Sequence, residues 1–326
     1  MHGMSAIASG VTPAAAPPPV GRKMRPNFGI IVPQLLKGAV VPFLGAGASM
    51  FHRRTLNEDG LCPPTACELA RRLAETAQFP DEPDYQQYRE DLARVASYFE
   101  LVELDRPGLR DYLRPVFNRD YTLNKLHRTL AAVARHKPLL IITTNYDDMI
   151  ERAFQTAEPE PLPYHLVVTA IEEEVVKYQR PNSTKLETVD PQSLKVSLEN
   201  ASIIYKMHGS INRHRSDDEE DHYVITEEDY VSFLGRMLIP SMIGALFMTR
   251  RFLFLGYSLR DWNFRVMLSR ALQAEGETRR AWAIQQRPNA IEKRLWEKKN
   301  VDIFDMDLSE LADELSEQIE QRLPKA

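Results

Sequence analysis

Six short apolar runs alternate with longer helical patterns, and this alternation limits the folds open to the chain. The runs are Val40–Leu44, Leu139–Thr143, Ile203–Met207, Phe252–Leu255, Ala281–Ile284 and Val301–Phe304. Each is too short for a helix and is bounded by turn or capping residues, as buried parallel strands are. Helical patterns occupy Cys67–Ala77, Leu123–Ala134, Met242–Met248, Asn289–Lys298 and Leu308–Leu323. The pattern predicts an α/β fold, with a parallel sheet of about six strands and helices on both faces.

Local signals divide the chain further. Thr65 followed by Glu68 is typical of a capping box before the first helix, and Asp307 is the expected N-cap of the last one. Residues 60–125 show helical spacing only, so we expect a helical insertion module between the first and second strands. Residues 155–200 are less regular. Residues 27–326 are interpreted as a single domain.

Residues 1–26 differ in composition from the rest of the chain. They are rich in Ala and Pro, include Pro17-Pro18-Pro19, and have neither a helical nor a strand period. Such a segment buries too little apolar surface to offset the entropy of ordering it. We therefore expect a flexible tail. It lacks the continuous apolar centre of a secretory signal.

Composition excludes several classes of protein. The chain has 326 residues, of which 43% are apolar and 27% charged, with a net charge of −5. That balance is unlike the clearly basic surface of a nucleic-acid-binding domain. No apolar run approaches the roughly 18 residues that span a bilayer. The two cysteines, Cys62 and Cys67, are too few for a four-cysteine zinc site. These features predict a cytoplasmic protein without direct nucleic-acid binding, membrane insertion or a bound metal.

The first candidate motif is Gly45-Ala46-Gly47-Ala48-Ser49, directly after the first predicted strand. Closely spaced glycines let backbone amides approach a phosphate, because glycine has no Cβ and tolerates positive φ. The alternative is a tight strand-to-helix turn without a ligand. The third glycine of the dinucleotide fingerprint is missing, which disfavours an ordinary hydride-transfer site.

Polar residues also follow three other predicted strands, at the edge where ligands bind in parallel sheets. Asn145 and Asp147 follow the second; their amide and carboxylate suit a water or a sugar hydroxyl, or either caps the next helix. His208 ends the third and precedes a glycine, which suits a general base, although a lone histidine is more often structural. Gly256 and Ser258 follow the fourth and suit a ribose or phosphate contact.

In their order along the chain and in their residues, these four motifs resemble those of the sirtuin-like superfamily, most closely its bacterial antiphage-defence branch, whose members cleave NAD. The resemblance covers about residues 35–310 and implies a Rossmann-like NAD-binding domain with a smaller helical module over the cleft. It implies that Gly45, Ala46, Gly47 and Ser49 hold the pyrophosphate, and that Asn145 and Asp147 bind the nicotinamide-side ribose and the water. It further implies that His208 is the catalytic base and that Gly256 and Ser258 contact the adenosine half.

Two departures from the deacetylating sirtuins bear on the substrate. Those enzymes carry a zinc ribbon of four cysteines, which this chain cannot form. They also carry an Ala-Gly-Ile-Pro-Asp-Phe-Arg loop after the glycine turn, where this chain has Met50-Phe51-His52-Arg53-Arg54. We therefore transfer no role to Arg53 or Arg54. Both departures disfavour an acetyl-lysine substrate.

The resulting hypothesis is an NAD glycohydrolase that converts NAD, as substrate, to ADP-ribose and nicotinamide and depletes NAD in abortive infection. One alternative is a deacylase or ADP-ribosyltransferase of the same fold. Another is a module that senses NAD or ADP-ribose without turnover. Because an unrestrained NAD-cleaving enzyme would drain its host, we expect a homo-oligomer. The resemblance also suggests an ATPase, helicase-like or Argonaute-like partner.

Overall fold

The computed structural model describes residues 25–50, 62–102, 105–211, 221–236, 238–259 and 281–323. Residues 1–24 of the expected tail lie outside these ranges, as do Arg53 and Arg54.

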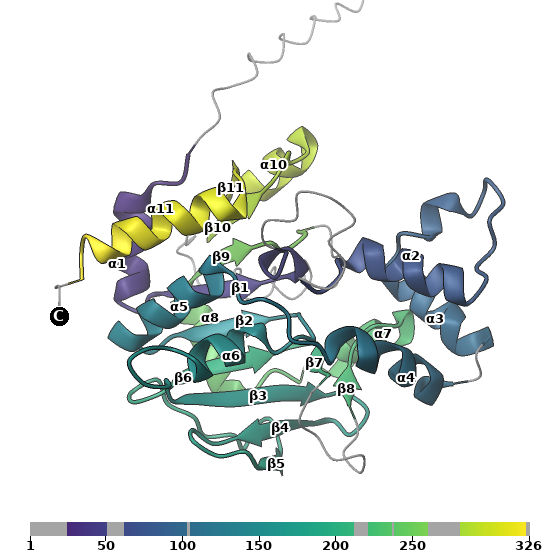
Figure 1. Ribbon diagram of the computed structural model, residues 1–326, viewed down its shortest axis with the longest axis horizontal. Coiled ribbons are helices and arrows are strands. Elements are labelled where there is room, and N and C mark those ends of the chain that lie inside the picture. The colour runs from purple at the N-terminus through teal and green to yellow at the C-terminus, as the bar shows by residue number, and fades with distance from the viewer. Residues whose placement is uncertain are drawn as a thin grey trace, which may run out of the picture.

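Within the described ranges, nine strands form one sheet (Figure 1). Their order is β11 (Val301–Asp305), β10 (Ala281–Gln285), β9 (Arg251–Leu255), β1 (Val40–Leu44), β2 (Leu140–Thr143), β6 (Ser202–Lys206), β3 (Tyr164–Ala170), β4 (Val175–Gln179) and β5 (Leu186–Val189). Neighbours from β11 to β3 pair in parallel, whereas β3–β4 and β4–β5 pair antiparallel. The predicted parallel sheet is confirmed, and all six predicted strands are present.

The expected number of about six strands was too low, because β3, β4 and β5 were not recognised. β4 alternates between buried and half-buried residues, and no residue of β5 is fully buried. Such strands lack the continuous apolar run by which buried parallel strands are recognised. They extend one edge of the sheet as an antiparallel meander.

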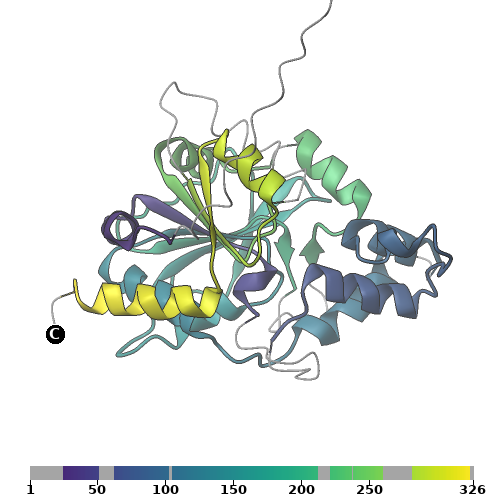
Figure 2. The same cartoon turned by 90° about the horizontal axis from the view of Figure 1, so that it is seen from above.

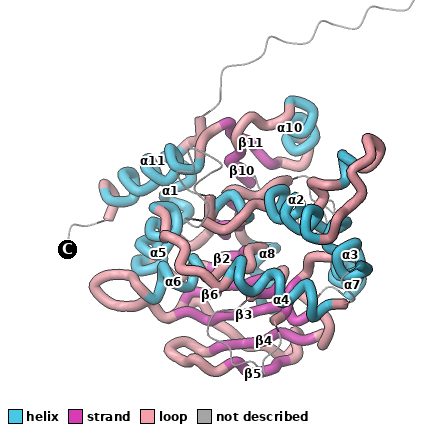
Figure 3. Tube along the Cα trace, turned by 45° about the vertical axis from the view of Figure 1, so that its right-hand side comes forward, coloured by secondary structure: helices cyan, strands magenta, loops and turns pink. Residues whose placement is uncertain are grey.

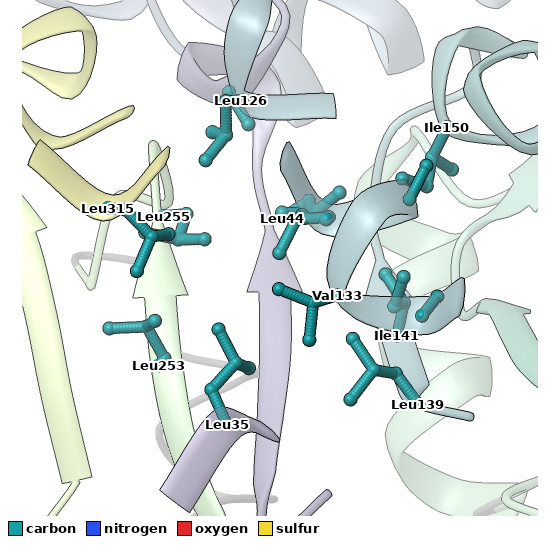
Figure 4. Close-up of a cluster of buried hydrophobic side chains, with 14 of the residues drawn as sticks. Leu35, Leu44, Leu126, Val133, Leu139, Ile141, Ile150, Leu253, Leu255 and Leu315 are labelled. Atoms are coloured by element: carbon teal, nitrogen blue, oxygen red, sulfur yellow. The ribbon is translucent and has the colours of Figure 1, made fainter. Parts of the chain in front are cut away.

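Helices cover both faces of the sheet, as predicted (Figure 2). One face carries α1 (Phe28–Leu36), α5 (Lys125–His136), α6 (Met149–Gln155) and α11 (Leu308–Glu320), and the other carries α8 (Ser241–Thr249) and α10 (Ala290–Glu297). Figure 4 shows the first of these cores: Leu35, Val133 and Leu315 from the helices lie around Leu44 and Leu255 of the sheet. All five side chains are at most 1% exposed. Burial of a leucine-sized side chain is worth about 1.5–3 kcal/mol, so this layer fixes the sheet.

A group of helices stands beside the carboxyl ends of the strands (Figures 1 and 3). It comprises α2 (Ala66–Thr76), α3 (Leu92–Val102) and α4 (Arg106–Phe117), with α7 (Glu227–Arg236) next to α3. The helices α2, α3 and α4 pack around their own apolar core, which also takes in Tyr146 from the loop after β2, whereas Phe233 of α7 belongs to a core of the sheet. Tyr146 therefore joins this group to the strand ends.

Two predicted helix caps are confirmed. The Thr65 side chain accepts a hydrogen bond from the Glu68 amide, and the Thr65 amide donates to the Glu68 carboxylate, which completes the capping box of α2. Asp307 accepts from the Ser309 amide at the start of α11.

In the residues that the structure describes, no single helix is long and apolar enough to cross a membrane. Together α7 and α8 have a sufficient length and composition, but they are bent by 83° relative to each other.

Candidate active site

The order in which the chain adds strands to the sheet reverses at β1. From β1 the chain continues to β2 on one side, whereas β9 pairs with β1 on the other side. Ligands of open α/β sheets bind at the carboxyl ends of strands where the order reverses in this way. Gly45 directly follows β1 and Gly256 directly follows β9, so both lie at this point.

The two glycine turns pack against each other through their backbones. The Gly45 amide donates to the Leu255 carbonyl at 3.0 Å, and the Gly47 amide donates to the Gly256 carbonyl at 2.9 Å. Gly256 has φ +63°, and a Cβ there would lie 2.1 Å from the Ala48 nitrogen. Close backbone packing therefore requires glycine at position 256, independently of any ligand. Ala46, half-buried, begins the short 3-10 turn Ala46–Ala48 between them.

Asn145, Ser49 and Asp147 form a buried hydrogen-bonded chain. Ser49 Oγ donates to Asp147 Oδ2 at 3.0 Å, so its oxygen is left to accept from Asn145 Nδ2 at 3.2 Å. Asn145 Nδ2 also donates to the Gly45 carbonyl at 3.1 Å. These acceptors fix which end of the Asn145 amide is nitrogen, because the Gly45 carbonyl has no proton and the single Ser49 hydroxyl proton is donated to Asp147. The motifs after β1 and β2 therefore form one unit.

The orientation of Asn145 leaves an acceptor unused. Its side chain is buried, and Oδ1 has no hydrogen-bond partner within the described residues. A buried polar atom without a partner costs about 1–3 kcal/mol, and such atoms in native proteins often mark a place for a water or a ligand. Oδ1 can accept only from a donor such as a water or a sugar hydroxyl.

Asp147 has a local role as well. Its Oδ1 accepts from the Met149 amide at 3.1 Å, and its Oδ2 accepts from Ser49. The first of these bonds satisfies a free amide at the start of α6, although the N-cap residue of this helix is Asp148 and not Asn145 or Asp147, which the sequence offered for that role. Both carboxylate oxygens are thus engaged inside the protein.

His208 lies at the same edge of the sheet as Asn145. Thr143 of β2 is paired with Lys206 of β6, so Asn145 and His208 each lie two residues beyond paired positions of neighbouring strands. The His208 ring is 6% exposed and lies edge-on to Tyr230 and Phe233 of α7, at centroid distances of 5.4 and 5.5 Å. Its backbone carbonyl accepts from the Val224 amide at 2.9 Å. The ring is therefore held between the end of β6 and α7.

A pocket of about 740 Å³ opens beside the glycine turns. It contains three of the residues predicted to bind NAD, namely Gly47, Gly256 and Ser258. The remaining lining comes mainly from the segments after β10 and β11: Met50, Tyr257, Ile284, Gln285, Gln286, Arg287, Pro288, Asn289, Glu292, Met306, Asp307, Leu308 and Ser309. Asn145 and His208 do not line this pocket. The predicted residues thus form three groups: the pocket residues, the Asn145 hydrogen-bonded chain and His208. The glycine turn after β1 links the first two groups, and the pairing of β2 with β6 links the second to His208.

The polar lining after β10 and β11 was not identified from the sequence. Gln285 Nε2 donates to the Tyr257 carbonyl at 3.4 Å, and Gln286 donates to Asp307. Burial opposes the charge of Asp307, but hydrogen bonds from Ser309 and Gln286 outweigh it and lower the pKa of this carboxyl. Their position in the sequence could have indicated them, because these polar residues follow two predicted strands at the ligand-binding edge of the sheet.

In the described part of the chain, no group of three or more His, Cys, Asp or Glu side chains is arranged to hold a metal ion.

A family model described as a SIR2-like domain matches residues 139–304, about half of the chain. The chain belongs to the SIR2-like family. The match runs from β2 to β11 and includes Asn145, His208 and Gly256.

Two curated relatives of this SIR2-like chain are named NAD(+) hydrolase ThsA. The protein from Enterococcus faecium is 30% identical over 183 residues, covering 55% of this chain and 31% of its own length. The one from Bacillus cereus (strain MSX-D12) is 25% identical over 228 residues, covering 67% and 41%. Defense-associated sirtuin 2 from Bacillus subtilis is 27% identical over 199 residues, covering 59% and 17%. The SIR2-like chain therefore spans less than half the length of each of these relatives.

Solved Sir2 structures align along most of the SIR2-like chain. A crystal structure of a Sir2 homologue in complex with NAD is 13% identical, with a TM-score of 0.41, and the alignment covers 90% of this chain and 94% of that one. A Sir2 enzyme described in a study of mechanism and regulation is likewise 13% identical, with a TM-score of 0.41 and coverage of 91% and 98%.

Proposed function

We propose that this SIR2-like protein is an NAD glycohydrolase, in which water replaces nicotinamide at the anomeric carbon of the ribose. The observation that carries the proposal is the unpartnered Oδ1 of Asn145, a buried acceptor at the carboxyl edge of the sheet. The relatives named NAD(+) hydrolase support the choice of substrate. The pocket beside Gly47, Gly256 and Ser258 has a volume in the range of small-molecule sites.

The reaction needs little covalent help from the protein. The water oxygen forms a bond to the anomeric carbon while the carbon–nitrogen bond breaks, and nicotinamide leaves neutral with the bonding electron pair. Asn145 Oδ1 accepts a hydrogen bond from the water or a ribose hydroxyl and so orients it. His208 accepts the proton that the water loses and passes it to solvent. Positioning and charge stabilisation supply most of the rate in such a step.

In this proposal, Ser49 and Asp147 hold the Asn145 amide and orient it toward the nicotinamide-side ribose. Gly45, Ala46 and Gly47 form the turn beside the pyrophosphate. Gly256 and Ser258 lie in the pocket that takes the adenosine half. The departures from deacetylating sirtuins, and the relatives' names, favour water over a peptide as the acceptor.

Nicotinamide release from NAD by the purified protein tests the proposal. We expect Asn145→Ala and His208→Ala each to lower the rate by about 10² to 10⁴-fold, the usual worth of a positioned acid or base. Asn118→Ala and His136→Ala, at exposed positions outside the site, are matched controls that should keep the wild-type rate. Folded Asn145 and His208 variants with wild-type turnover would show that the site is wrongly assigned. A wild-type protein that binds NAD without releasing nicotinamide would indicate a sensing module.

We further propose that the protein acts in the cytoplasm in antiphage defence, by NAD depletion that halts the infected cell. The relative named Defense-associated sirtuin 2 supports this context. An NAD-cleaving enzyme needs restraint in an uninfected cell, so we propose a homo-oligomer whose assembly controls turnover, with an ATPase, helicase-like or Argonaute-like partner. Light scattering across a concentration series, paired with turnover, tests the first part. A monomer that is fully active alone would contradict it.

A further inference from the structure

A lysine is completely buried in the central strand β6, next to the candidate active site. Lys206 is 0% exposed, and it pairs with Glu151 of α6, with 2.9 Å between Nζ and Oε1. Nζ also donates to the Asp147 carbonyl and, at 3.5 Å, to the Tyr146 carbonyl. The three protons of the ammonium group are therefore directed at three oxygens. Two of these oxygens belong to the backbone directly after Asn145.

A buried charge pair of this kind contributes little net free energy to stability. Removing two charges from water costs several kcal/mol for each ion, and apolar replacements of buried pairs are often neutral or stabilising. Burial raises the pKa of the Glu151 carboxyl, a rise that the charge of Lys206 partly offsets. Glu151 Oε2 has no hydrogen-bond partner in the described ranges. A different benefit must account for a charge pair at this position.

The benefit follows from where β2 leaves the sheet. The last backbone bond of the β2–β6 ladder here runs from the Met207 amide to the Thr143 carbonyl. Beyond it, the chain turns through residues 144–148 toward α6 and leaves the β2–β6 ladder, although the Tyr146 carbonyl still accepts from the Ile211 amide at 3.3 Å. From the neighbouring strand, Lys206 donates to the Asp147 carbonyl and shares the Tyr146 carbonyl with the Ile211 amide. We propose that Lys206 is a positioning residue, which holds the turn after β2 so that Asn145 Oδ1 points at the substrate, and that Glu151 neutralises and orients Lys206.

This inference rests on the proposed function and assigns these two residues a role in the same site. It predicts that rate and stability respond differently to loss of the pair. Lys206→Met alone leaves Glu151 buried without its partner, so its melting temperature should fall well below that of the wild type. The double variant Lys206→Met/Glu151→Leu removes both charges and fills the space with apolar atoms. It should melt within a few degrees of the wild type, yet it lacks the Lys206 donor to the Asp147 carbonyl and leaves the Tyr146 carbonyl with the Ile211 amide alone.

The decisive comparison is the double variant against the wild type. We expect kcat for nicotinamide release to fall about 10 to 100-fold, because small misplacements of a catalytic group cost that much, while KM for NAD stays within about threefold. Amide hydrogen exchange over residues 144–148 should quicken while the rest of the sheet stays protected. Lys125→Ala/Asp313→Ala removes a surface Lys–Asp pair of 2.7 Å and is the matched control, with wild-type kcat and exchange expected.

The outcomes separate the two proposals. A double variant with recovered melting temperature and wild-type kcat would overturn the positioning role and leave a purely structural pair. Unchanged exchange over residues 144–148 would overturn it as well, whether or not the protein cleaves NAD. Absence of nicotinamide release by the wild type would remove the proposed function while the exchange measurement still tests Lys206. Should the double variant fail to fold, Lys206→Met measured below its own melting temperature serves the same comparison.

Discussion

The Gly47 amide donates to the Gly256 carbonyl at 2.9 Å, across the point where the strand order of the sheet reverses. The contact joins two turns that lie more than 200 residues apart in the sequence and that both border the 740 Å³ pocket. A Cβ on Gly47 would lie 2.8 Å from the Gly256 oxygen, so neither turn has room for a side chain at the contact. The same glycines thus close the sheet edge and shape the pocket.

We expect Gly256→Ala to destabilise the protein by about 1–3 kcal/mol or more. The substitution places a Cβ at a positive φ and 2.1 Å from the Ala48 nitrogen, a backbone atom that cannot move independently. Gly235→Ala on α7 is the matched control, because an added Cβ there has nothing within 4 Å, and in a helix it should stabilise by about 0.5–1 kcal/mol. Denaturant unfolding of both variants measures the difference. A Gly256→Ala variant with the free energy of unfolding of the wild type would show that the two turns can move apart freely.

Short apolar runs were enough to predict the parallel part of the sheet. Runs such as Val40–Leu44 are buried along their whole length, and only a strand between two helical layers needs that composition. β4 could not be found in this way, since Lys177 and Gln179 alternate with buried residues. Glu174, in the turn before β4, has φ +57°, a left-handed conformation that a run of three glutamates does not predict.

Which side chains meet at the site was only partly predictable. The sequence indicated that Ser49 and Asn145 both follow strands, and parallel strands bring such residues to one edge. That Ser49 donates to Asp147, and thereby fixes the Asn145 amide, depends on side-chain geometry that no spacing rule contains. Lys206 is a charged residue inside an apolar run, but two of its three acceptors are backbone carbonyls, which no sequence pattern distinguishes.

Ser49→Ala should lower both stability and turnover. It removes the donor to Asp147 Oδ2 and an acceptor of Asn145 Nδ2, both buried, which costs about 1–3 kcal/mol of unfolding free energy. Turnover should fall because the Asn145 amide is then held by the Gly45 carbonyl alone. The control is Ser316→Ala, which removes a serine–carboxylate bond of 3.0 Å on the surface of α11 and should change stability by less than about 0.5 kcal/mol. A Ser49 variant with full activity would contradict the orienting role.

Deleting residues 1–26 should leave stability and turnover almost unchanged. Of the described residues, the deletion removes Arg25, which pairs with Glu310 and Glu314 of α11 at 2.8 and 3.0 Å, and Pro26, which is buried and accepts from the Phe28 amide at 3.1 Å. The arginine side chain is 70% exposed, and exposed pairs contribute about 0–1 kcal/mol. We therefore expect the melting temperature to fall by no more than a few degrees. Arg25→Ala in the full chain should reproduce the part of the change that the ion pairs cause, and Pro26 should account for a small remainder. A loss on deletion well beyond that remainder would assign a packing role to the removed segment.

His127 should make the protein sensitive to mild acid. Burial lowers its pKa to about 4, and its Nδ1 lies 2.8 Å from Asn124 Oδ1, which can only accept, so Nδ1 carries the proton of the neutral ring. In the unfolded chain, histidine titrates near 6.5. Between pH 6.5 and 4 the unfolded state therefore binds a proton that the folded state does not. The stabilising contribution is complete above pH 6.5 and is lost as the pH falls toward 4.

The size of this effect follows from the pKa difference, which corresponds to about 3 kcal/mol over the interval. His127→Leu removes the titrating group and keeps a buried apolar side chain in α5, so its unfolding free energy should change less between pH 7 and pH 4 by about that amount. Asn124 donates to the Ala48 carbonyl at 2.7 Å, so loss of its histidine neighbour also loosens one support of the glycine turn. His136→Gln, at the exposed end of the same helix, is the control. If the free energy of unfolding of the His127 variant falls with acid as steeply as that of the wild type, another group is responsible for the acid sensitivity, because every other titrating residue is common to both proteins.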